Sequence, residues 1–242
     1  MYKTISNKIL LDCTGNSTIY RQGNTVIKVI NKYNFINYRN EFNILNKLDH
    51  KNIIKIHKTH STNSRFYMYM DNYPCGDLHY NISQKRIINR SNIPKLIYDV
   101  CNPIQYVHSK NIVHLDLKPE NYLLNHNNNN DFTLIDFQGS KYHNSYYDLK
   151  KNAHLVYTKL YASPEVIDDH YCKASDMYSI GVFLYAFCTD KIPVDFMIDK
   201  ELLNDRVPPH ISNFISDLLS FNHNHRPSIH DIQSYKWIKP SL

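Results

Sequence analysis

The sequence predicts an α+β fold with two lobes, a small one rich in β-strands with one helix and a larger, mainly helical one. Before about residue 72, apolar residues occur in short, β-branched runs, and after it they recur mostly at helical spacing. At 242 residues the chain is long enough to bury a substantial core. We expect residues 1–72 to form the first lobe and residues 73–242 the second, within one domain. A ligand cleft is expected at their junction.

The first lobe is expected to begin with a strand hairpin. Residues 11–30, "LDCTGNSTIYRQGNTVIKVI", alternate apolar and polar side chains around a Gly/Asn turn, with strands at "STIYRQ" and "TVIKVI". Two later runs, "NIIKIHK" and "RFYMYM", have the same β-branched and aromatic character. In "RNEFNILNKL", Phe42, Leu45 and Leu48 recur at intervals of three, which predicts the one helix of this lobe.

The second lobe is expected to open with a long helix. Its apolar face is marked by Ile93, Leu96, Ile97, Val100, Ile104 and Val107. Pro103 within this pattern predicts a kink. Further helices are expected at 175–189, at 211–220 and near 228–238. The segment "NIVHLDLKPENYLLNHNNNNDFTLIDFQGS" instead predicts a strand, a polar loop, two more strands and the turn between them, with residues 125–130 as a loose hairpin loop.

Composition argues against several classes of protein. The net charge of +6 comes from scattered Lys and Arg, so we expect neither nucleic acid nor a membrane surface as the main partner. Five cysteines without C-x-x-C spacing indicate neither a disulfide framework nor a zinc site, which fits a reducing, intracellular setting such as the cytoplasm or nucleus. The longest apolar stretch, residues 180–187, is too short to span a bilayer, so a soluble chain is expected.

One polar segment has the residues for chemistry. "HLDLKPEN", residues 114–121, places a carboxylate, an ammonium and an amide in one loop bracketed by apolar runs, so these groups should project from the edge of a core. Further along, Asp136 ends the apolar run "FTLID". Two carboxylates, an amide and a lysine suit a site for Mg²⁺ and phosphate, because Mg²⁺ prefers hard oxygen ligands.

With these segments in this order, the chain resembles a eukaryotic-type protein kinase. The resemblance implies that Lys28 in "VIK" holds the α- and β-phosphates of ATP, and that Glu41 is its ion-pair partner on the helix. Asp116 falls at the position that accepts the proton of the substrate hydroxyl, and Lys118 at the lysine that supports the transferring phosphate. The two positions that hold Mg²⁺ match Asn121 and Asp136.

The resemblance continues downstream. "YASPE", residues 161–165, resembles the end of the activation segment, and "SDMYSIG" with Asp176 resembles the start of the central helix. Arg226 in "HNHRPS" matches the family's partner for Glu165. For His114 a structural role is implied, with its ring against Phe137 in a stack that also contains Leu45 and Ile56.

The same resemblance outlines a nucleotide pocket. Adenine would lie beneath Leu11, Ile19 and Val26 and above Leu123. The remaining residues of this pocket are Met70 as gatekeeper, Asp71, Asn72 and Tyr73 as the hinge, and Asp77. Two roles stay open for Asp77, because it would either bind the ribose or join Glu120 in receiving an arginine upstream of the target residue.

The loop "DLKPEN" and Thr158 in "TKLYASPE" resemble the Ser/Thr branch of the family, in which the threonine hydroxyl bridges the catalytic aspartate and lysine. The implied function is a monomeric Ser/Thr protein kinase that uses ATP and Mg²⁺ to phosphorylate protein substrates, with a preference for basic ones. An impaired pseudokinase that acts as a binding or scaffold module remains the alternative. A small-molecule kinase is disfavoured by the full "YASPE" segment.

Three departures from the family pattern qualify the prediction. Leu115 replaces an arginine that reads phosphorylation of the activation segment, so we expect activity without a phosphate there, although the hydroxyls of Ser145, Tyr146 and Tyr147 look available. Gln138 replaces the glycine after Asp-Phe, and a glycine follows one place later. In the nucleotide loop, the three glycine positions are occupied by Asp12, Thr14 and Ser17, which predicts weaker ATP binding.

Overall fold

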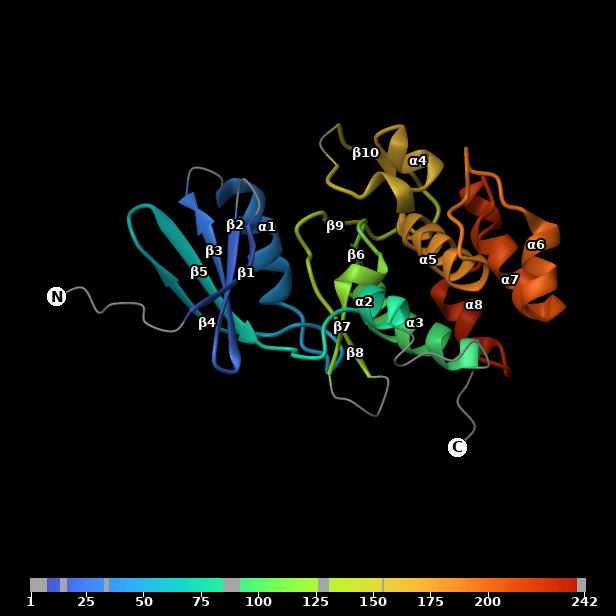
Figure 1. The fold of residues 1–242 in the computed structure, drawn as a ribbon. Helices are drawn as coiled ribbons and strands as arrows, with labels where there is room; N and C mark the ends of the chain where they lie inside the picture. The colour runs from blue at the N-terminus through green and yellow to red at the C-terminus, as the bar shows by residue number, and fades with distance from the viewer. Residues whose placement is uncertain are drawn as a thin grey trace.

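The computed structural model describes residues 8–13, 17–32, 35–84, 92–125, 131–153 and 155–238. A β-rich lobe and a mainly helical lobe lie side by side along the chain's long axis (Figure 1), which confirms the predicted α+β class. One apolar core cluster includes side chains from both lobes, from Ile30 in the first to Ile238 in the second. The lobes are therefore joined by packing as well as by the chain.

The first lobe is a five-stranded antiparallel sheet in the order β1-β2-β3-β5-β4. Its strands are β1 (Ile9–Cys13), β2 (Ser17–Gln22), β3 (Thr25–Asn31), β4 (Ile56–Ser61) and β5 (Arg65–Asp71). The β2–β3 turn uses Gly23 at φ +59°, a left-handed conformation that glycine adopts without steric cost. β4 starts later than "NIIKIHK" suggested, because Ile53 pairs with Leu134 of the second lobe instead.

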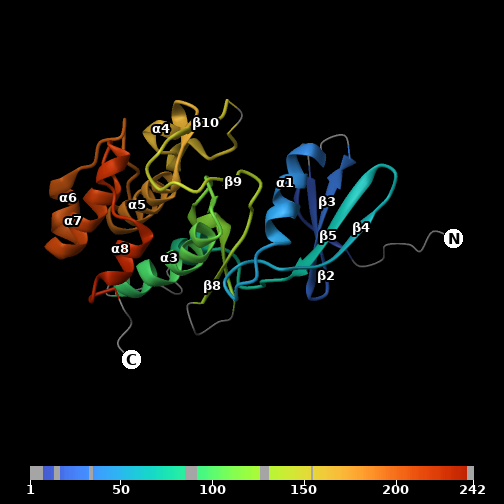
Figure 2. The ribbon, with the colours of Figure 1, turned by 180° about the vertical axis from the view of Figure 1, so that it is seen from behind.

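Helix α1 (Phe35–Leu45) lies between the sheet and the second lobe in both views of the ribbon (Figures 1 and 2). Ile44 and Leu45 are buried, and the ring of Phe42 meets that of Phe66 edge-on at 5.5 Å between centroids. The helix begins and ends earlier than the apolar triad predicted, since Leu48 is buried beyond its end. This placement directs one face of α1 toward the junction of the lobes.

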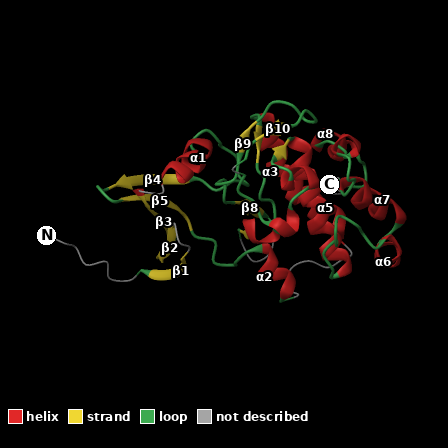
Figure 3. Ribbon diagram, turned by 90° about the horizontal axis from the view of Figure 1, so that it is seen from above, coloured by secondary structure: helices red, strands yellow, loops and turns green. Residues whose placement is uncertain are grey.

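The second lobe contains the helices α2 (Leu78–Ser83), α3 (Ile93–Ser109), α4 (Pro164–Ile167), α5 (Lys173–Thr189), α6 (Lys200–Arg206), α7 (Pro209–Leu218) and α8 (Ile229–Ser234). α3 continues through Pro103 without a break. α5 is surrounded by other helices (Figure 3), and nearly all its side chains are buried. The short α2 and α6 were not predicted, because six or seven residues give too little periodicity to recognise.

Short strand pairs cover the side of the second lobe that faces the sheet. They are β7 (Tyr122–Leu124) with β8 (Phe132–Leu134), and β6 (Ile112–Val113) with β9 (Lys141–Tyr142). A third pair joins β10 (Lys150–Lys151) to β11 (His170–Tyr171). The strand, loop, strand pattern predicted here is confirmed, while residues 126–130 of the expected Asn-rich loop lie outside the described residues. No helix within the described ranges has the length and apolar character needed to cross a membrane.

Candidate active site

A cavity of about 580 Å³ lies between the sheet and the second lobe. It is lined by every residue predicted to bind the nucleotide or metal: Leu11, Ile19, Val26, Lys28, Glu41, Met70, Asp71, Asn72, Tyr73, Asp77, Asn121, Leu123 and Asp136. Asp12 and Glu120 also line it. Segments far apart in the sequence therefore converge on one space, with the apolar side chains of β1, β2 and β3 on one side and Leu123 of β7 on the other.

The hinge between the lobes has fewer open main-chain groups than the sequence suggested. The N–H of Asn72 already donates to the carbonyl of Asn24 at 3.1 Å, and the carbonyl of Tyr73 accepts from Gly76 at 3.3 Å. The N–H of Asn72 is therefore not open to a ligand. Met70 precedes these residues at the end of β5, with its side chain buried.

A buried ion pair joins β3 to α1. The Nζ of Lys28 donates to both carboxylate oxygens of Glu41, at 2.9 and 2.7 Å. Burial raises the pKa of Glu41, and the positive charge of Lys28 opposes that rise. Because Lys28 is in the middle of a strand paired on both sides, its ammonium has a fixed position in the cavity. The Oδ1 of Asp136 lies 3.9 Å from the same ammonium.

Three side chains meet at the loop of residues 114–121, called the catalytic loop below. The Nζ of Lys118 lies 3.0 Å from the Oδ2 of Asp116 and donates to the hydroxyl of Thr158 at 2.7 Å. The backbone N–H of Thr158 donates to the Oδ1 of Asp116 at 2.8 Å. The hydroxyl therefore contacts the lysine, while the main chain of the same residue contacts the aspartate, a division that sequence reasoning did not anticipate.

This arrangement keeps the Asp116 carboxylate ionised. Burial acts to raise its pKa, but the hydrogen bond from Thr158 and the charge of Lys118 outweigh burial, so the pKa is lowered. An ionised carboxylate with two donors already attached can orient a hydroxyl group and accept its proton.

The two predicted metal ligands both line the main cavity. The Nδ2 of Asn121 donates to the carbonyl and the Oδ2 of Asp116, at 2.7 and 3.2 Å, which fixes the direction of its amide. Asp136, at φ +61°, has a buried Oδ1 without a hydrogen-bond partner among the described residues. That unsatisfied oxygen and a nearby amide oxygen fit a Mg²⁺ ion that also takes phosphate oxygens. No group of three His, Cys, Asp or Glu in the described ranges could hold a metal without such help.

Asp176 of α5 binds the backbone of the catalytic loop. The sequence did not reveal this role. Its carboxylate accepts from the backbone N–H groups of His114 and Leu115, at 2.9 and 2.8 Å, and lies 2.8 Å from the Nε2 of His108. Leu115 has φ +69°, so these bonds hold the loop in an unfavourable conformation. The available signal was the single acidic residue in the sequence of α5. The ring of His114 packs edge-on against Phe137, at 4.7 Å between centroids.

Leu115 belongs to a second, smaller apolar cluster with Val113, Ala162, Val166 and Tyr171. Leu155 and Tyr157 of the activation segment pack against this cluster. Hydrophobic packing therefore occupies the position where the family pattern has a phosphate-reading arginine.

The three hydroxyl groups that looked available for phosphorylation, those of Ser145, Tyr146 and Tyr147, all donate hydrogen bonds within the chain. Tyr146 and Tyr147 donate to the carbonyls of Pro227 and Arg226, and Ser145 donates to Asp148.

The end of the activation segment is fixed by a second buried ion pair. The guanidinium of Arg226 donates to both oxygens of Glu165, at 2.6 and 2.9 Å. Burial acts to raise the pKa of Glu165, but the bonds and charge of Arg226 outweigh it and lower the pKa. Arg226 also donates to the carbonyls of Ala174, Ser220 and Phe221. The pair predicted from the family resemblance is therefore formed.

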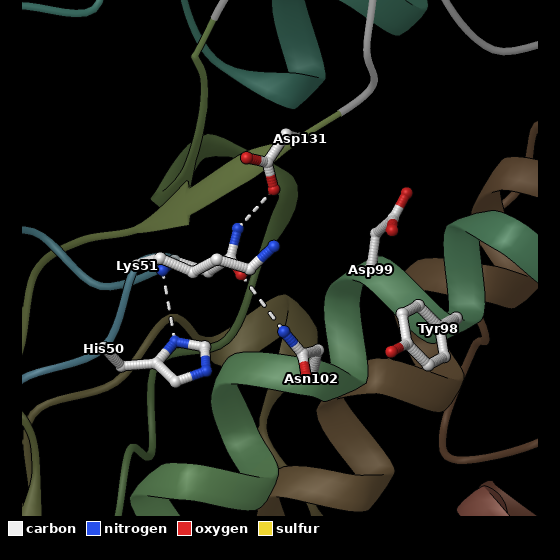
Figure 4. A pocket seen from close by; sticks show the side chains of 7 residues that line it. His50, Lys51, Tyr98, Asp99, Asn102 and Asp131 are labelled. Atoms are coloured by element: carbon white, nitrogen blue, oxygen red, sulfur yellow. Dashed lines mark hydrogen bonds between the residues drawn. The ribbon is translucent and has the colours of Figure 1, made fainter.

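A separate polar cavity of about 270 Å³ lies where the α1–β4 connection meets α3 and β8 (Figure 4). Asn52 is one of its lining residues, and it donates to Asp131 at 2.5 Å and accepts from Asn102 at 3.1 Å. Burial raises the pKa of Asp99 to about 6, although Lys95 donates to it and opposes the rise. These hydrogen bonds join Asn52 of the first lobe to Asn102 and Asp131 of the second lobe.

Comparison with known proteins agrees with this geometry. A family model described as protein kinase domain matches residues 18–238. Calcium-dependent protein kinase 4 of Plasmodium falciparum is 28% identical over 204 residues, which cover 78% of this chain and 38% of that protein. Aurora kinase of Schizosaccharomyces pombe is 27% identical over 200 residues, covering 78% and 55% of the two chains. Probable serine/threonine-protein kinase nek3 of Dictyostelium discoideum is 31% identical over 210 residues, covering 79% and 18%.

Proposed function

The chain belongs to the protein kinase domain family, and we propose that it is an active Ser/Thr protein kinase that transfers the γ-phosphate of ATP to protein substrates. The single observation that carries the proposal is the Asp116, Lys118 and Thr158 arrangement, in which hydrogen bonds and the charge of Lys118 keep the carboxylate ionised. A chain released from catalysis would have no need to maintain this geometry. Activity, substrates and partners are proposed for this chain, which spans 38% of the Plasmodium falciparum relative.

Each residue would have a defined task. Lys28, held by Glu41, would bind the α- and β-phosphates, and Lys118 would bind the transferring phosphate. Asn121 and Asp136 would hold Mg²⁺, which neutralises phosphate charge when bound. Asp116 would orient the substrate hydroxyl and accept its proton late in the transfer, because a Ser or Thr alkoxide is costly to form early. Positioning and charge neutralisation would therefore supply most of the rate enhancement.

We also propose that the preferred protein substrates carry a basic residue upstream of the target. The Oε2 of Glu120 is buried and has no hydrogen-bond partner within the described part of the chain, while its Oε1 lies 3.8 Å from the Nδ1 of His79. Asp77 is less suited to this task, because its Oδ1 caps α2 by accepting from the N–H of Tyr80 at 2.7 Å. A peptide array in which upstream Arg or Lys gives no advantage would contradict this preference.

The rival function is a pseudokinase that acts as a scaffold. It is favoured only by the nucleotide loop, where other residues, among them Asp12, replace the family's glycines. Transfer of radiolabel from ATP to a basic protein distinguishes the two, with wild type compared with Asp116→Ala and Lys28→Met. We expect wild type to label the protein and both variants to lose nearly all signal. Equal signal from all three would overturn the catalytic assignment. Asp217→Asn, on the surface of α7, is a control expected to behave like wild type.

The proposal includes a monomer in a reducing compartment. No disulfide joins the five cysteines, all of which lie in described segments. Sedimentation of the purified chain would test the oligomeric state directly.

A further inference from the structure

The three most exposed large apolar side chains in the described ranges lie close together. Met197 is 72% exposed, Val194 is 70% exposed and Phe221 is 69% exposed. Val194 and Met197 flank Phe196, whose ring lies 6.0 Å from that of Phe221. Single exposed apolar residues are common on protein surfaces, but a group of them marks an interaction site. We refer to these four residues as the apolar patch.

The turn that carries the patch is held in an unfavourable backbone conformation. Val194 and Met197 exchange two backbone hydrogen bonds, of 3.2 and 2.8 Å, around Asp195 and Phe196. Both central residues are left-handed, with φ of +48° and +62°. Turns of this kind strongly favour Asn-Gly, and a bulky side chain with positive φ is unusual. Phenylalanine here indicates that its ring is needed at this spot.

The turn is also rigidly anchored. Ile192 and Ile198, on either side of it, pack against the main core. The N–H of Asp199 donates to the hydroxyl of Tyr185 at 3.0 Å, and the Oδ1 of Asp199 accepts from Leu202 at the start of α6. The exposed tip therefore stands on a fixed base, so binding there would require little ordering of the chain.

The patch adjoins the end of the activation segment. The ring of Phe196 lies 6.3 Å from that of Tyr178, and the guanidinium of Arg226 lies over the same tyrosine at 4.9 Å. Arg226 in turn holds Glu165 of α4. A polypeptide lying across the activation segment would reach the patch if it continued past α4.

The charge around the patch indicates the chemistry of its occupant. Residues 190–201 contain four acidic side chains, Asp190, Asp195, Asp199 and Glu201, against Lys191 and Lys200, whereas the whole chain has a net charge of +6. Within the described segments, Asp195 and Glu201 form no ion pair and are exposed. An acidic rim around apolar side chains favours a partner segment that combines apolar and basic residues.

We propose that the apolar patch is a docking site for a segment of the protein substrate that carries an apolar side chain next to Lys or Arg, outside the stretch that is phosphorylated. This inference rests on the proposed kinase function and extends it to substrate selection. Docking would raise the effective concentration of the target hydroxyl at Asp116 without contributing to the chemical step.

The test compares wild type, the double variant Val194→Ser with Met197→Ser, which removes the apolar side chains without adding charge, and Leu10→Ser as a matched control. Leu10 is an exposed apolar residue of β1, at 57% exposure, on the other lobe. The substrates are histone H1, as a long basic protein, and a short peptide containing Arg-Arg-Ala-Ser. We expect the double variant to raise the KM for histone H1 by about five-fold or more. Its kcat, and both constants for the short peptide, should match wild type, as should all constants of Leu10→Ser.

Binding measured without turnover separates this proposal from the kinase assignment. In an Asp116→Asn background, fluorescence anisotropy of labelled histone H1 should show the same loss of affinity in the double variant. Equal binding by both forms would overturn the docking site, whether or not wild type phosphorylates anything. A wild-type dimer that the double variant dissociates in sedimentation would also overturn it, by assigning the patch to a second copy of the chain. Circular dichroism verifies that the variants are folded.

Discussion

A Cβ atom on Gly139 would overlap the carbonyl oxygen of Val156. The beginning of the activation segment therefore touches its later part backbone to backbone, and only glycine permits that approach. The neighbouring Ser140 donates to the carbonyl of His114 at 3.1 Å and accepts from Asn40 of α1 at 2.6 Å. Gly139 thus lies at a point where the helix, the catalytic loop and the activation segment meet.

We expect Gly139→Ala to displace the activation segment and to remove most kinase activity. Overpacking of this kind costs about 1–3 kcal/mol, so the melting temperature should also fall by a few degrees. Steady-state kinetics and thermal denaturation measure both effects. Gln138→Gly is the matched control, since Gln138 is only partly buried. This variant should leave kinase activity and the melting temperature nearly unchanged. If Gly139→Ala retained full activity, the close approach would have no functional meaning.

Packing around Leu115 predicts activity without phosphorylation of the activation segment. Leu155 and Tyr157 pack against the cluster that contains Leu115, in place of a phosphate held by arginine. Treatment with a phosphatase, followed by removal of that enzyme, should leave kinase activity within about two-fold of the untreated value, because the loss of an unused phosphate changes no contact. Complete loss of activity would show that a phosphate is required.

The same cluster predicts that shortening the side chain of Leu115 lowers the free energy of unfolding. Leu115→Ala removes buried apolar contacts, and such substitutions cost about 2–5 kcal/mol. We expect a lower melting temperature together with a lower kcat, because Leu115 adjoins Asp116. Leu149→Ala, at an exposed position of the same segment, is the control and should change neither. Equal melting temperatures for Leu115→Ala and wild type would argue against a structural role for the cluster.

Thr158 is predicted to position Lys118 through its hydroxyl. Thr158→Val removes the 2.7 Å hydrogen bond to the Nζ of Lys118 but keeps the backbone N–H that binds Asp116. We expect kcat to fall by about ten-fold or more, because a charge-assisted hydrogen bond is lost, while the KM for ATP changes little. Thr158→Ser restores the hydroxyl and should recover most of the rate. An unchanged kcat in Thr158→Val would contradict the role of the Thr158 hydroxyl in positioning Lys118.

The two lobes and the polar loop of residues 114–121 were predictable from local signals, whereas distant pairs such as Lys28 with Glu41 were implied only by the family resemblance. Alternating β-branched runs mark β2, β3 and β5, and "HLDLKPEN" places Asp116, Lys118 and Asn121 in one loop. Contacts between distant segments were not predictable in the same way. Asp176 supports the catalytic loop only because α5 passes beneath it, and Gly139 is required only because Val156 returns to it. Sequence periodicity contains no information about such approaches.

Asp99 in the polar cavity predicts a pH dependence of stability. Its pKa in the folded chain is raised to about 6 from the ordinary aspartate value of 3.8, mainly by burial. The folded state therefore holds this proton more tightly than the unfolded state, so the contribution of Asp99 to stability falls as pH rises from about 4 to about 6. Asp99→Asn should raise the melting temperature at pH 7 relative to wild type, with a smaller difference near pH 4. A difference independent of pH would contradict the shifted pKa, and Asp205→Asn, at an exposed position of α6, controls for the loss of a surface charge.

Asp12 is predicted to weaken ATP binding. It lines the main cavity, and its Oδ1 accepts from the backbone N–H of Cys13 at 2.8 Å, so the carboxylate is held close to the strand beneath which the nucleotide would lie. Of the other replaced glycine positions, Thr14 lies outside the described residues, and Ser17 is buried and paired with Ile30, so glycine there would weaken β2.

The single substitution Asp12→Asn is therefore the sharper test, because it removes the charge and keeps the shape. A negative charge several ångströms from phosphate costs roughly 1 kcal/mol in a solvated site, so the KM for ATP should fall by about two- to five-fold at low salt. The difference should shrink at high ionic strength, where exposed charges are screened. Asp12→Glu keeps the charge and should leave the KM near that of wild type. A KM that stays the same or rises in Asp12→Asn would mean that the carboxylate does not face the phosphates, and that the loop already accommodates ATP without glycine.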